Sequence, residues 1–198
     1  MNRTKTDNHN PAAKLELRRH FLRQLVRENE PIRVLDCFQG SGLLWNRLRS
    51  EFPVAAYWGV DVKPKKGRLK IDSARILEQP GWNQNVIDLD AYGSPWKHFQ
   101  NLIATCNHSV AVFLTVGMVR IGGGNCGKAA LEIAGVRFEK LKLPSALGVK
   151  ISENTLNHAL AAAENRGFQI GEIFEAFPQK NARYIGLKMG FPREKNLQ

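Results

Sequence analysis

The chain has 198 residues, of which 43% are hydrophobic and 24% charged, and its formal net charge is +11. This length predicts one domain, and the composition excludes a disordered chain. No apolar run in the sequence reaches the ~20 residues needed to cross a bilayer, and residues 1–14 show no apolar secretory signal. The positive charge favours a polyanionic partner, of which nucleic acid is the commonest large one, over a merely soluble basic surface.

The three cysteines, Cys37, Cys106 and Cys126, lie far apart in the sequence. Their odd number and wide spacing favour a reducing compartment, so we expect a cytoplasmic protein without a disulfide framework. The sequence contains no Cys-x-x-Cys pair and no His/Cys cluster, so no metal site is predicted.

The first part of the chain predicts alternating helices and strands. Residues 1–11 are polar and are expected to be a disordered tail. Residues 12–29 place apolar side chains at helical spacing with arginines between them, which indicates an amphipathic helix with a basic face. Residues 32–38 form an apolar run that stops at a glycine-rich turn, as buried parallel strands do. A helix over "LLWNRLRSEF" and a second strand over 54–62 should follow.

The remainder continues this alternation and ends in a hairpin. Short strands are expected within "LKIDSARIL" and "NVIDLDAY", then a helix from Pro95 and a long strand over 109–118. Residues 119–150 are less regular and are expected to form an insertion. A helix over "ENTLNHALAAAENRG" precedes two strand-like runs, which "PQKN" joins closely enough for an antiparallel pair.

This order predicts an α/β fold: a doubly wound, Rossmann-like sheet of seven strands with an antiparallel terminal hairpin strand, in one domain over 12–198. In such sheets the ligand binds beyond the carboxyl ends of the strands. Four acids fall at predicted strand ends: Asp36, Asp61, Asp72 and Asp90. Carboxylates that share one edge repel one another, so fold stability alone would not select them. Asp72, taken alone, could equally be a turn residue or a helix cap.

The first turn, Asp36 to Gly42, contains two glycines that would let a ligand approach the backbone. A nicotinamide site needs a third glycine, where this chain has Trp45. The acid at the strand end also disfavours a pyrophosphate, and it suits a cofactor with a cationic amino-acid end, such as S-adenosylmethionine. Asp61 would then accept from both ribose hydroxyls, and Asp72 with Ser73 would accept from the adenine amino group. The predicted cofactor contacts are Asp36, Cys37, Phe38, Gly40, Ser41, Gly42, Asp61, Val62, Asp72 and Ser73.

At these residues the chain resembles the class I methyltransferase family. "LDCFQGSG" is similar to the family's first motif, DxxxGxG, and "GVDV" is similar to its acidic second motif. The terminal hairpin resembles the family's reversed last strand, so the resemblance extends over roughly residues 30–190. It implies methyl transfer from S-adenosylmethionine.

A second motif, "DLDAYGSP" at residues 88–95, ends the fourth predicted strand. In methyltransferases that act on nucleobase amino groups, this strand ends in Asp/Asn-Pro-Pro-aromatic. The run resembles still more closely the Asp-Leu-Asp-Pro-Phe/Tyr-Gly-Ser-Pro of the tRNA guanine N2-dimethyltransferase family, with Ala91 in place of proline. The resemblance implies that Asp90 accepts the hydrogens of the target amine and that Tyr92 stacks on the base. The alternative for Tyr92 is a ring packed on the following helix.

The motif implies an amino nitrogen of a nucleobase as the methyl acceptor, in RNA rather than in DNA. That family also carries a C-terminal tRNA-binding domain, whereas this sequence ends soon after its last predicted strand. The basic helix and residues 63–70 are expected to hold the nucleic-acid backbone. The predicted catalytic residues are Asp90 and Tyr92, and the predicted substrate contacts are Ala91, Gly93, Ser94, Pro95 and Lys128.

Other chemistries fit the sequence less well. C5-cytosine methylation needs a nucleophilic cysteine in a Pro-Cys turn, and no cysteine of this sequence is placed so. Residues 122–128 are glycine-rich but lack phosphate-loop spacing, so they are expected to form a loop beside the substrate. Two alternatives stay open. One is a methyltransferase for DNA, a small molecule or a protein, and the other is a non-catalytic nucleic-acid-binding protein with a relict cofactor fold.

Overall fold

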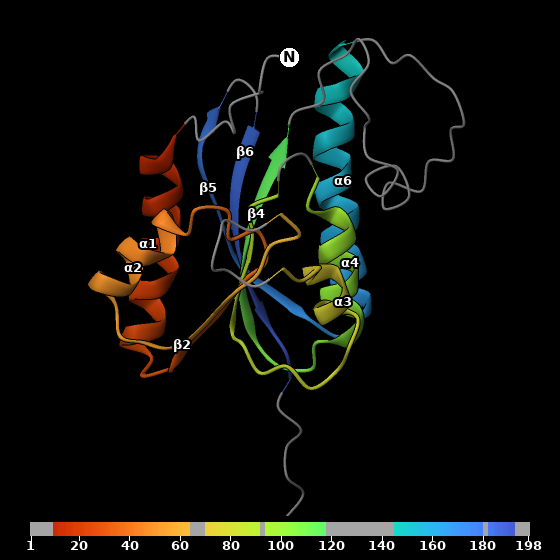
Figure 1. Cartoon of the computed structure of the whole chain (residues 1–198). Helices are drawn as coiled ribbons and strands as arrows, with labels where there is room; N and C mark the ends of the chain where they lie inside the picture. The colour runs from red at the N-terminus through yellow and green to blue at the C-terminus, as the bar shows by residue number, and fades with distance from the viewer. Residues whose placement is uncertain (1–9, 64–69, 92–93, 118–144, 180–181, 193–198) are drawn as a thin grey trace, which may run out of the picture.

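The computed structural model describes residues 10–63, 70–91, 94–117, 145–179 and 182–192. A single mixed sheet runs through the centre, with α1 (Pro11–Arg27) and α2 (Leu43–Glu51) on one face (Figure 1). Of the described helices, three lie on the other face: α3 (Ser73–Leu77), α4 (Trp96–Thr105) and α6 (Ser145–Asn165). This is the predicted α/β arrangement, with helices on both faces of the sheet.

The strand order of the sheet is β2-β1-β3-β4-β6-β5. The four parallel strands are β1 (Ile32–Asp36), β2 (Val54–Gly59), β3 (Val86–Leu89) and β4 (Val110–Gly117). β6 (Ala182–Gly190) runs antiparallel to both β4 and β5 (Gln169–Gln179), which confirms the predicted terminal hairpin.

The described part of the chain has six strands, whereas the sequence predicted seven. The missing strand is the one expected in "LKIDSARIL", where the structure has only an isolated parallel bridge between Asp61 and Lys70. Asp72 then caps α3, so the chain turns into a helix two residues after the bridge. The helix start competes with extension of the strand, and only one pair of residues is left for the sheet.

The strands alternate between two apolar clusters, one on each face of the sheet. Val34, Val86 and Phe113 pack with α1 and α2, while Leu35, Ile87 and Leu114 pack with α3, α4 and α6. Since side chains two residues apart share a face, polar residues that continue the first set must face α1 and α2. These are Asp36, Asp88, Asp90 and Thr115.

Helix α1 is amphipathic as predicted, but its basic residues are not all on its outer face. Asn10 caps the first turn by accepting from the N–H of Ala13 at 3.0 Å. Arg18 is buried instead of forming part of a basic surface, because it lies on the side that packs against the sheet. Phe21, on the same side, occupies the space over Gly186 of β6, where an added Cβ would come within 2.2 Å of the ring. Gly186 therefore sets how closely α1 approaches the sheet.

The last helix begins earlier than the sequence predicted. α6 starts at Ser145, inside the expected insertion over 119–150, and ends near Gly167, whose φ of +92° suits the predicted C-cap. Most of that insertion and residues 1–9 of the expected tail lie outside the described residues. Among the described helices, none combines the length and the apolar character required to cross a bilayer.

Candidate active site

The acids at the carboxyl ends of the strands fall into two groups. Asp36, Asp88 and Asp90 face α1 and α2, and we call them the inner carboxylates. Asp61 and Asp72 follow β2 and the isolated bridge, and we call them the outer carboxylates. The two groups differ in the partners that hold them.

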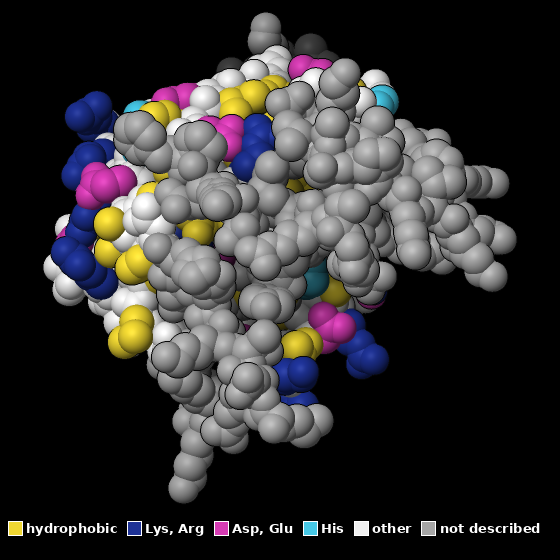
Figure 2. Space-filling view, turned by 90° about the horizontal axis from the view of Figure 1, so that it is seen from above, with side chains coloured by type: hydrophobic (Ala, Val, Ile, Leu, Met, Phe, Trp, Pro, Cys, Tyr) yellow, Lys and Arg dark blue, Asp and Glu magenta, His cyan; other side chains and the backbone are white. Residues whose placement is uncertain are grey.

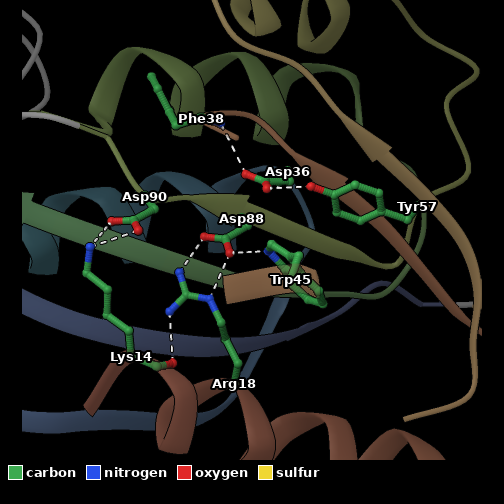
Figure 3. A network of polar contacts seen from close by, with 8 residues as sticks. All are labelled: Lys14, Arg18, Asp36, Phe38, Trp45, Tyr57, Asp88 and Asp90. Carbon is green, nitrogen blue, oxygen red and sulfur yellow. Dashed lines mark hydrogen bonds and ion pairs between the residues drawn. The ribbon is translucent and has the colours of Figure 1, made fainter. Parts of the chain in front are cut away.

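Asp88 is the centre of the inner group and forms a buried ion pair with Arg18 (Figure 3). The guanidinium donates from Nε to Oδ2 at 2.7 Å and from the second nitrogen to Oδ1 at 2.6 Å. Trp45 of α2 donates from Nε1 to Oδ2 at 2.6 Å. Burial lowers the pKa of Arg18, but attraction to Asp88 outweighs it, so the pKa is raised and the side chain stays charged.

Asp90, the predicted catalytic acid, is held by a lysine of α1. Lys14 Nζ lies 2.6 Å from Oδ1 and 2.8 Å from Oδ2, and the two side chains are only 6% and 21% exposed. Burial opposes ionisation of Asp90, but Arg18, Lys14 and a hydrogen bond from Thr115 outweigh it and lower its pKa. Asp90 is therefore a carboxylate at neutral pH, and both of its oxygens already bind an amine of the chain.

The sequence analysis missed Lys14 and the pairing role of Arg18. A signal was present, because Lys14 and Arg18 are spaced by four on a helix and Asp88 and Asp90 by two on a strand. Four residues rise ~6 Å along a helix and two rise ~6.6 Å along a strand, so the two pairs can match. Reading that signal required knowing that α1 lies over β3.

Asp36 completes the inner group, in contact with Tyr57. The Tyr57 hydroxyl donates to Oδ2 at 2.8 Å, and the N–H of Phe38 lies 3.3 Å from Oδ1. Burial, followed by repulsion from Asp88, raises the pKa of Asp36 to about 8. Asp36 is therefore protonated at pH 7, and it is only 3% exposed. A neutral, buried carboxyl does not attract a cation, so the contact of Asp36 with a cationic cofactor end stays a prediction.

The glycine turn and Asp61 come together as the sequence predicted. Gly40 and Gly42 have φ values of +50° and +68°, a region that glycine enters without strain, and Gly42 leads into α2. The N–H of Gly40 donates to Asp61 Oδ2 at 2.9 Å, and that of Lys63 donates to Oδ1 at 2.7 Å. Val62, next in the chain, is 47% exposed. Asp61 thus accepts only backbone N–H groups within the described residues, and lone pairs remain on both oxygens.

Asp72 is the N-cap of α3, accepting from the N–H of Ala74 at 3.0 Å, so the helix-cap alternative describes its place in the fold. The hydroxyl of Ser73 donates to the carbonyl of Cys37 at 2.9 Å. The Cys37 thiol is buried, and burial raises its pKa well above the ordinary value. Three of the predicted cofactor residues therefore lie where β1 meets α3.

A histidine that the sequence analysis did not single out joins this group. His98, in the first turn of α4, has Nε2 3.0 Å from the Ser73 hydroxyl oxygen and its ring 4.6 Å from that of Phe38. Its Nδ1 and the hydroxyl oxygen of Ser94 are both buried and find no hydrogen-bond partner in the part of the chain that the structure describes. Spacing gave no hint of His98, because its neighbours come from the turn after β1 and from α3.

The remaining predicted site residues are only partly described. Ala91 and Pro95 are buried, and Ser41 is half-buried in the turn before α2. Tyr92, Gly93 and Lys128 lie outside the described residues.

A cavity of about 180 Å³ opens between α1 and α2, beside the Lys14–Asp90 pair. Its lining is Pro11, Lys14, Leu15, Leu43, Leu44 and Arg47. No group of three or more His, Cys, Asp or Glu side chains within the described ranges could hold a metal ion.

The sequence itself matches no family model and no curated protein. Solved structures with the same fold are found, however. Trm1 from Pyrococcus horikoshii, solved with S-adenosylmethionine, aligns with a TM-score of 0.58 at 16% identity and covers 92% of this chain. The chain spans only 56% of the length of that Trm1 chain. The plantazolicin methyltransferase BamL, solved with a substrate analogue and S-adenosylhomocysteine, aligns with a TM-score of 0.55 at 11% identity, covering 93% of this chain and 87% of its own. The chain therefore has the fold of S-adenosylmethionine-dependent methyltransferases.

Proposed function

We propose that this protein is an S-adenosylmethionine-dependent methyltransferase that acts on an exocyclic amino nitrogen of a nucleobase, in RNA rather than in DNA. The observation that carries the proposal is the meeting of the Gly40 turn with Asp61 at the carboxyl edge of a methyltransferase fold. We place the protein in the cytoplasm, where Cys37 and Cys106 would remain the free, buried thiols that they are in the structure.

The donor set around this turn fits S-adenosylmethionine. The lone pairs left on Asp61 suit two ribose hydroxyls, and the exposed side chain of Val62 offers an apolar surface for one face of adenine. Asp72 and Ser73 lie at the start of α3, where an adenine amino group would find acceptors. When bound, the cofactor would supply an electrophilic methyl group on a sulfonium.

The role of this chain at the acceptor would fall to Asp90. An exocyclic amine is a weak nucleophile because its lone pair is delocalised into the ring. An ionised carboxylate that accepts its hydrogens would orient the lone pair toward the methyl group, with Tyr92 stacking on the base. Since Lys14 binds both oxygens of Asp90, an incoming amine must take over at least one of these contacts.

A polyanionic acceptor is favoured by the net charge of +11. In a view onto the carboxyl edge of the sheet, Lys and Arg side chains gather on the side of α1 and α2 (Figure 2). On α2 the exposed cations are Arg47 and Arg49. These side chains would contact phosphates and would not select the base.

The direct test is transfer of tritiated methyl groups from S-adenosylmethionine to total RNA and to genomic DNA, followed by nucleoside analysis. We expect label in an N-methylated nucleoside from RNA. The Asp90→Asn variant should lower the transfer rate on the order of 10²–10³-fold while keeping its affinity for S-adenosylhomocysteine. Equal loss of transfer and cofactor affinity would contradict the role of Asp90, label in DNA alone would contradict the choice of RNA, and no label in either nucleic acid would contradict the nucleobase target.

One observation favours a second candidate, a nucleic-acid-binding protein that does not transfer methyl groups. Lys14 already satisfies the carboxylate that catalysis would need. This alternative predicts salt-dependent RNA binding with no heat on titration with S-adenosylhomocysteine. Calorimetry on the purified chain therefore separates the two candidates.

A further inference from the structure

The hydrogen-bond chain that ends at His98 fixes the state of its imidazole ring. The Ser73 hydroxyl carries one proton, which it donates to the carbonyl of Cys37 at 2.9 Å. The same oxygen lies 3.0 Å from His98 Nε2, and with its proton already used it can only accept there. Nε2 is therefore the protonated nitrogen of His98. Nδ1 is then an acceptor, because burial lowers the pKa of His98 and keeps the ring neutral.

That acceptor has no donor among the residues that the structure describes. Within the described ranges, His98 Nδ1 is buried and has no hydrogen-bond partner, and the same is true of the hydroxyl oxygen of Ser94, two residues before the start of α4. Buried polar atoms are normally hydrogen-bonded, and two exceptions at one end of one helix indicate groups reserved for a ligand. The ligand must offer a donor to Nδ1 and, to the Ser94 hydroxyl, an acceptor or a donor.

The neighbours of His98 place this ligand among the predicted cofactor residues. The imidazole packs on the ring of Phe38 at 4.6 Å and bonds to Ser73, next to Asp72. Asp90 faces α1 on the other side of the sheet, where an acceptor amine would bind. The ligand group that bonds to His98 is therefore different from the acceptor amine that would bond to Asp90.

We propose that His98 and Ser94 recognise the adenine edge of the methyl donor, with His98 Nδ1 accepting from the 6-amino group and the Ser94 hydroxyl bonding a ring nitrogen. The proposal rests on the binding of S-adenosylmethionine put forward above. An amino group beside a ring nitrogen also occurs on acceptor bases, so the test must separate the two sources. His98 is then a specificity residue for the donor.

The test compares S-adenosylhomocysteine with S-inosylhomocysteine, in which a carbonyl oxygen replaces the 6-amino donor. The wild-type chain should bind the adenosyl compound about tenfold more tightly in calorimetry, because the inosyl oxygen would face an acceptor. His98→Phe keeps a ring on Phe38 but removes Nδ1, so it should lose about tenfold in affinity for the adenosyl compound and reduce the preference, since Asp72 remains as a second acceptor for the amino group. His98→Asn retains an acceptor oxygen and should keep part of the preference.

The matched control is His108→Phe. His108 also packs on an aromatic ring, Trp82, and lies 3.0 Å from the carbonyl of Gln84, just before β4 begins at the opposite edge of the sheet. Its substitution should leave both affinities unchanged. If His98→Phe binds S-adenosylhomocysteine as the wild type does, the proposal is overturned, whatever happens to the KM of an acceptor nucleic acid. If the wild-type chain binds neither compound, the proposed function itself fails.

Discussion

The inner and outer carboxylates lie at the same edge of one sheet, yet they are held by different partners. The inner acids, Asp36, Asp88 and Asp90, bond to side chains of α1, α2 and β2, two of them cationic. Asp61 and Asp72 bond to backbone N–H groups close to them in space. Asp88 and Asp90 attach α1 to the sheet, and Asp36 bonds to Tyr57 of β2, whereas the outer acids shape turns and keep oxygen lone pairs for a ligand.

The difference shows what a strand-end acid can mean. An acid with a buried cationic partner is part of the fold, because removal of either charge leaves the other unpaired. An acid that accepts only backbone N–H groups can lose its charge at little structural cost. Asp90 pairs with Lys14 like the other acid with a cationic partner, and yet it occupies the motif position predicted for the catalytic acid.

The largest effect is expected from Arg18→Met. The substitution leaves Asp88 as a buried, unpaired charge, so the free energy of unfolding should fall by ~3–5 kcal/mol. Urea unfolding measures the loss. The adjacent Arg19→Met is the control, because Arg19 pairs with Glu51 and Glu16 near the surface and should cost at most ~1 kcal/mol. Similar losses in the two variants would show that the Arg18–Asp88 pair does not hold α1 to the sheet.

Asp36→Asn should change how stability depends on pH. The folded protein keeps the Asp36 proton up to a pKa of about 8, while the unfolded chain releases it near the ordinary value of 3.8. The folded state therefore binds more protons between these values, and this group makes stability fall as pH rises through the window. Asparagine has no such proton. As pH rises through this window, the free energy of unfolding of the variant should therefore increase relative to that of the wild type by up to ~1.4 kcal/mol per pH unit.

Thermal unfolding at pH 5 and at pH 7.5 checks this prediction. Parallel curves for wild type and Asp36→Asn would mean that Asp36 is already ionised in the folded protein. Tyr57→Phe is a useful companion, because it removes the hydroxyl that favours the ionised form of Asp36 and should raise the pKa of that acid further.

Asp61→Asn should affect the ligand more than the fold. Loss of charge-assisted hydrogen bonds to ribose hydroxyls should weaken S-adenosylhomocysteine binding by ~1.5–3 kcal/mol, roughly 10–150-fold. The free energy of unfolding should change by at most ~1 kcal/mol, because the amide oxygen can still accept from Gly40 and the exposed N–H of Lys63, which loses its acceptor, can bond to water. Calorimetry and urea unfolding on the same preparation give both values. A variant that loses stability but keeps its affinity for S-adenosylhomocysteine would show that Asp61 supports the fold, as the inner carboxylates do, and does not bind the ligand.

The smallest effect is expected at Asp72. Asp72→Ala removes the N-cap of α3 and should cost ~1 kcal/mol of stability, whereas Asp72→Asn keeps a capping oxygen and should cost a few tenths. Thermal unfolding compares the two variants. If both destabilise equally, capping is not the role of Asp72 in the fold.

The sequence correctly predicted those elements whose structure follows from local features, such as apolar runs and short connections. Residues 32–38 and 109–118 contained the apolar runs that became β1 and β4, and the short connection "PQKN" identified the hairpin. The third predicted strand failed because its fate depended on competition between one sheet bridge and the capped start of α3. That competition is decided by tertiary contacts.

Within the candidate site, the motifs placed the Gly40 turn beside Asp61, since both follow directly from strand ends. They could not reveal that Lys14 holds Asp90, because those residues are 76 positions apart and meet only through the docking of α1. His98 escaped notice for the same reason. Its partners Ser73 and Phe38 come from other elements of the fold.

The pairing of α1 with β3 has a consequence for how this sequence can change. Lys14 and Arg18 reach Asp90 and Asp88 together only while three residues separate the two cations. Each helical residue adds ~100° of rotation, so inserting or deleting one residue between them would turn one cation away from its carboxylate. Substitutions on the outer face of α1 leave this pairing intact. The number of residues between Lys14 and Arg18, however, must stay the same in any related sequence that keeps both acids.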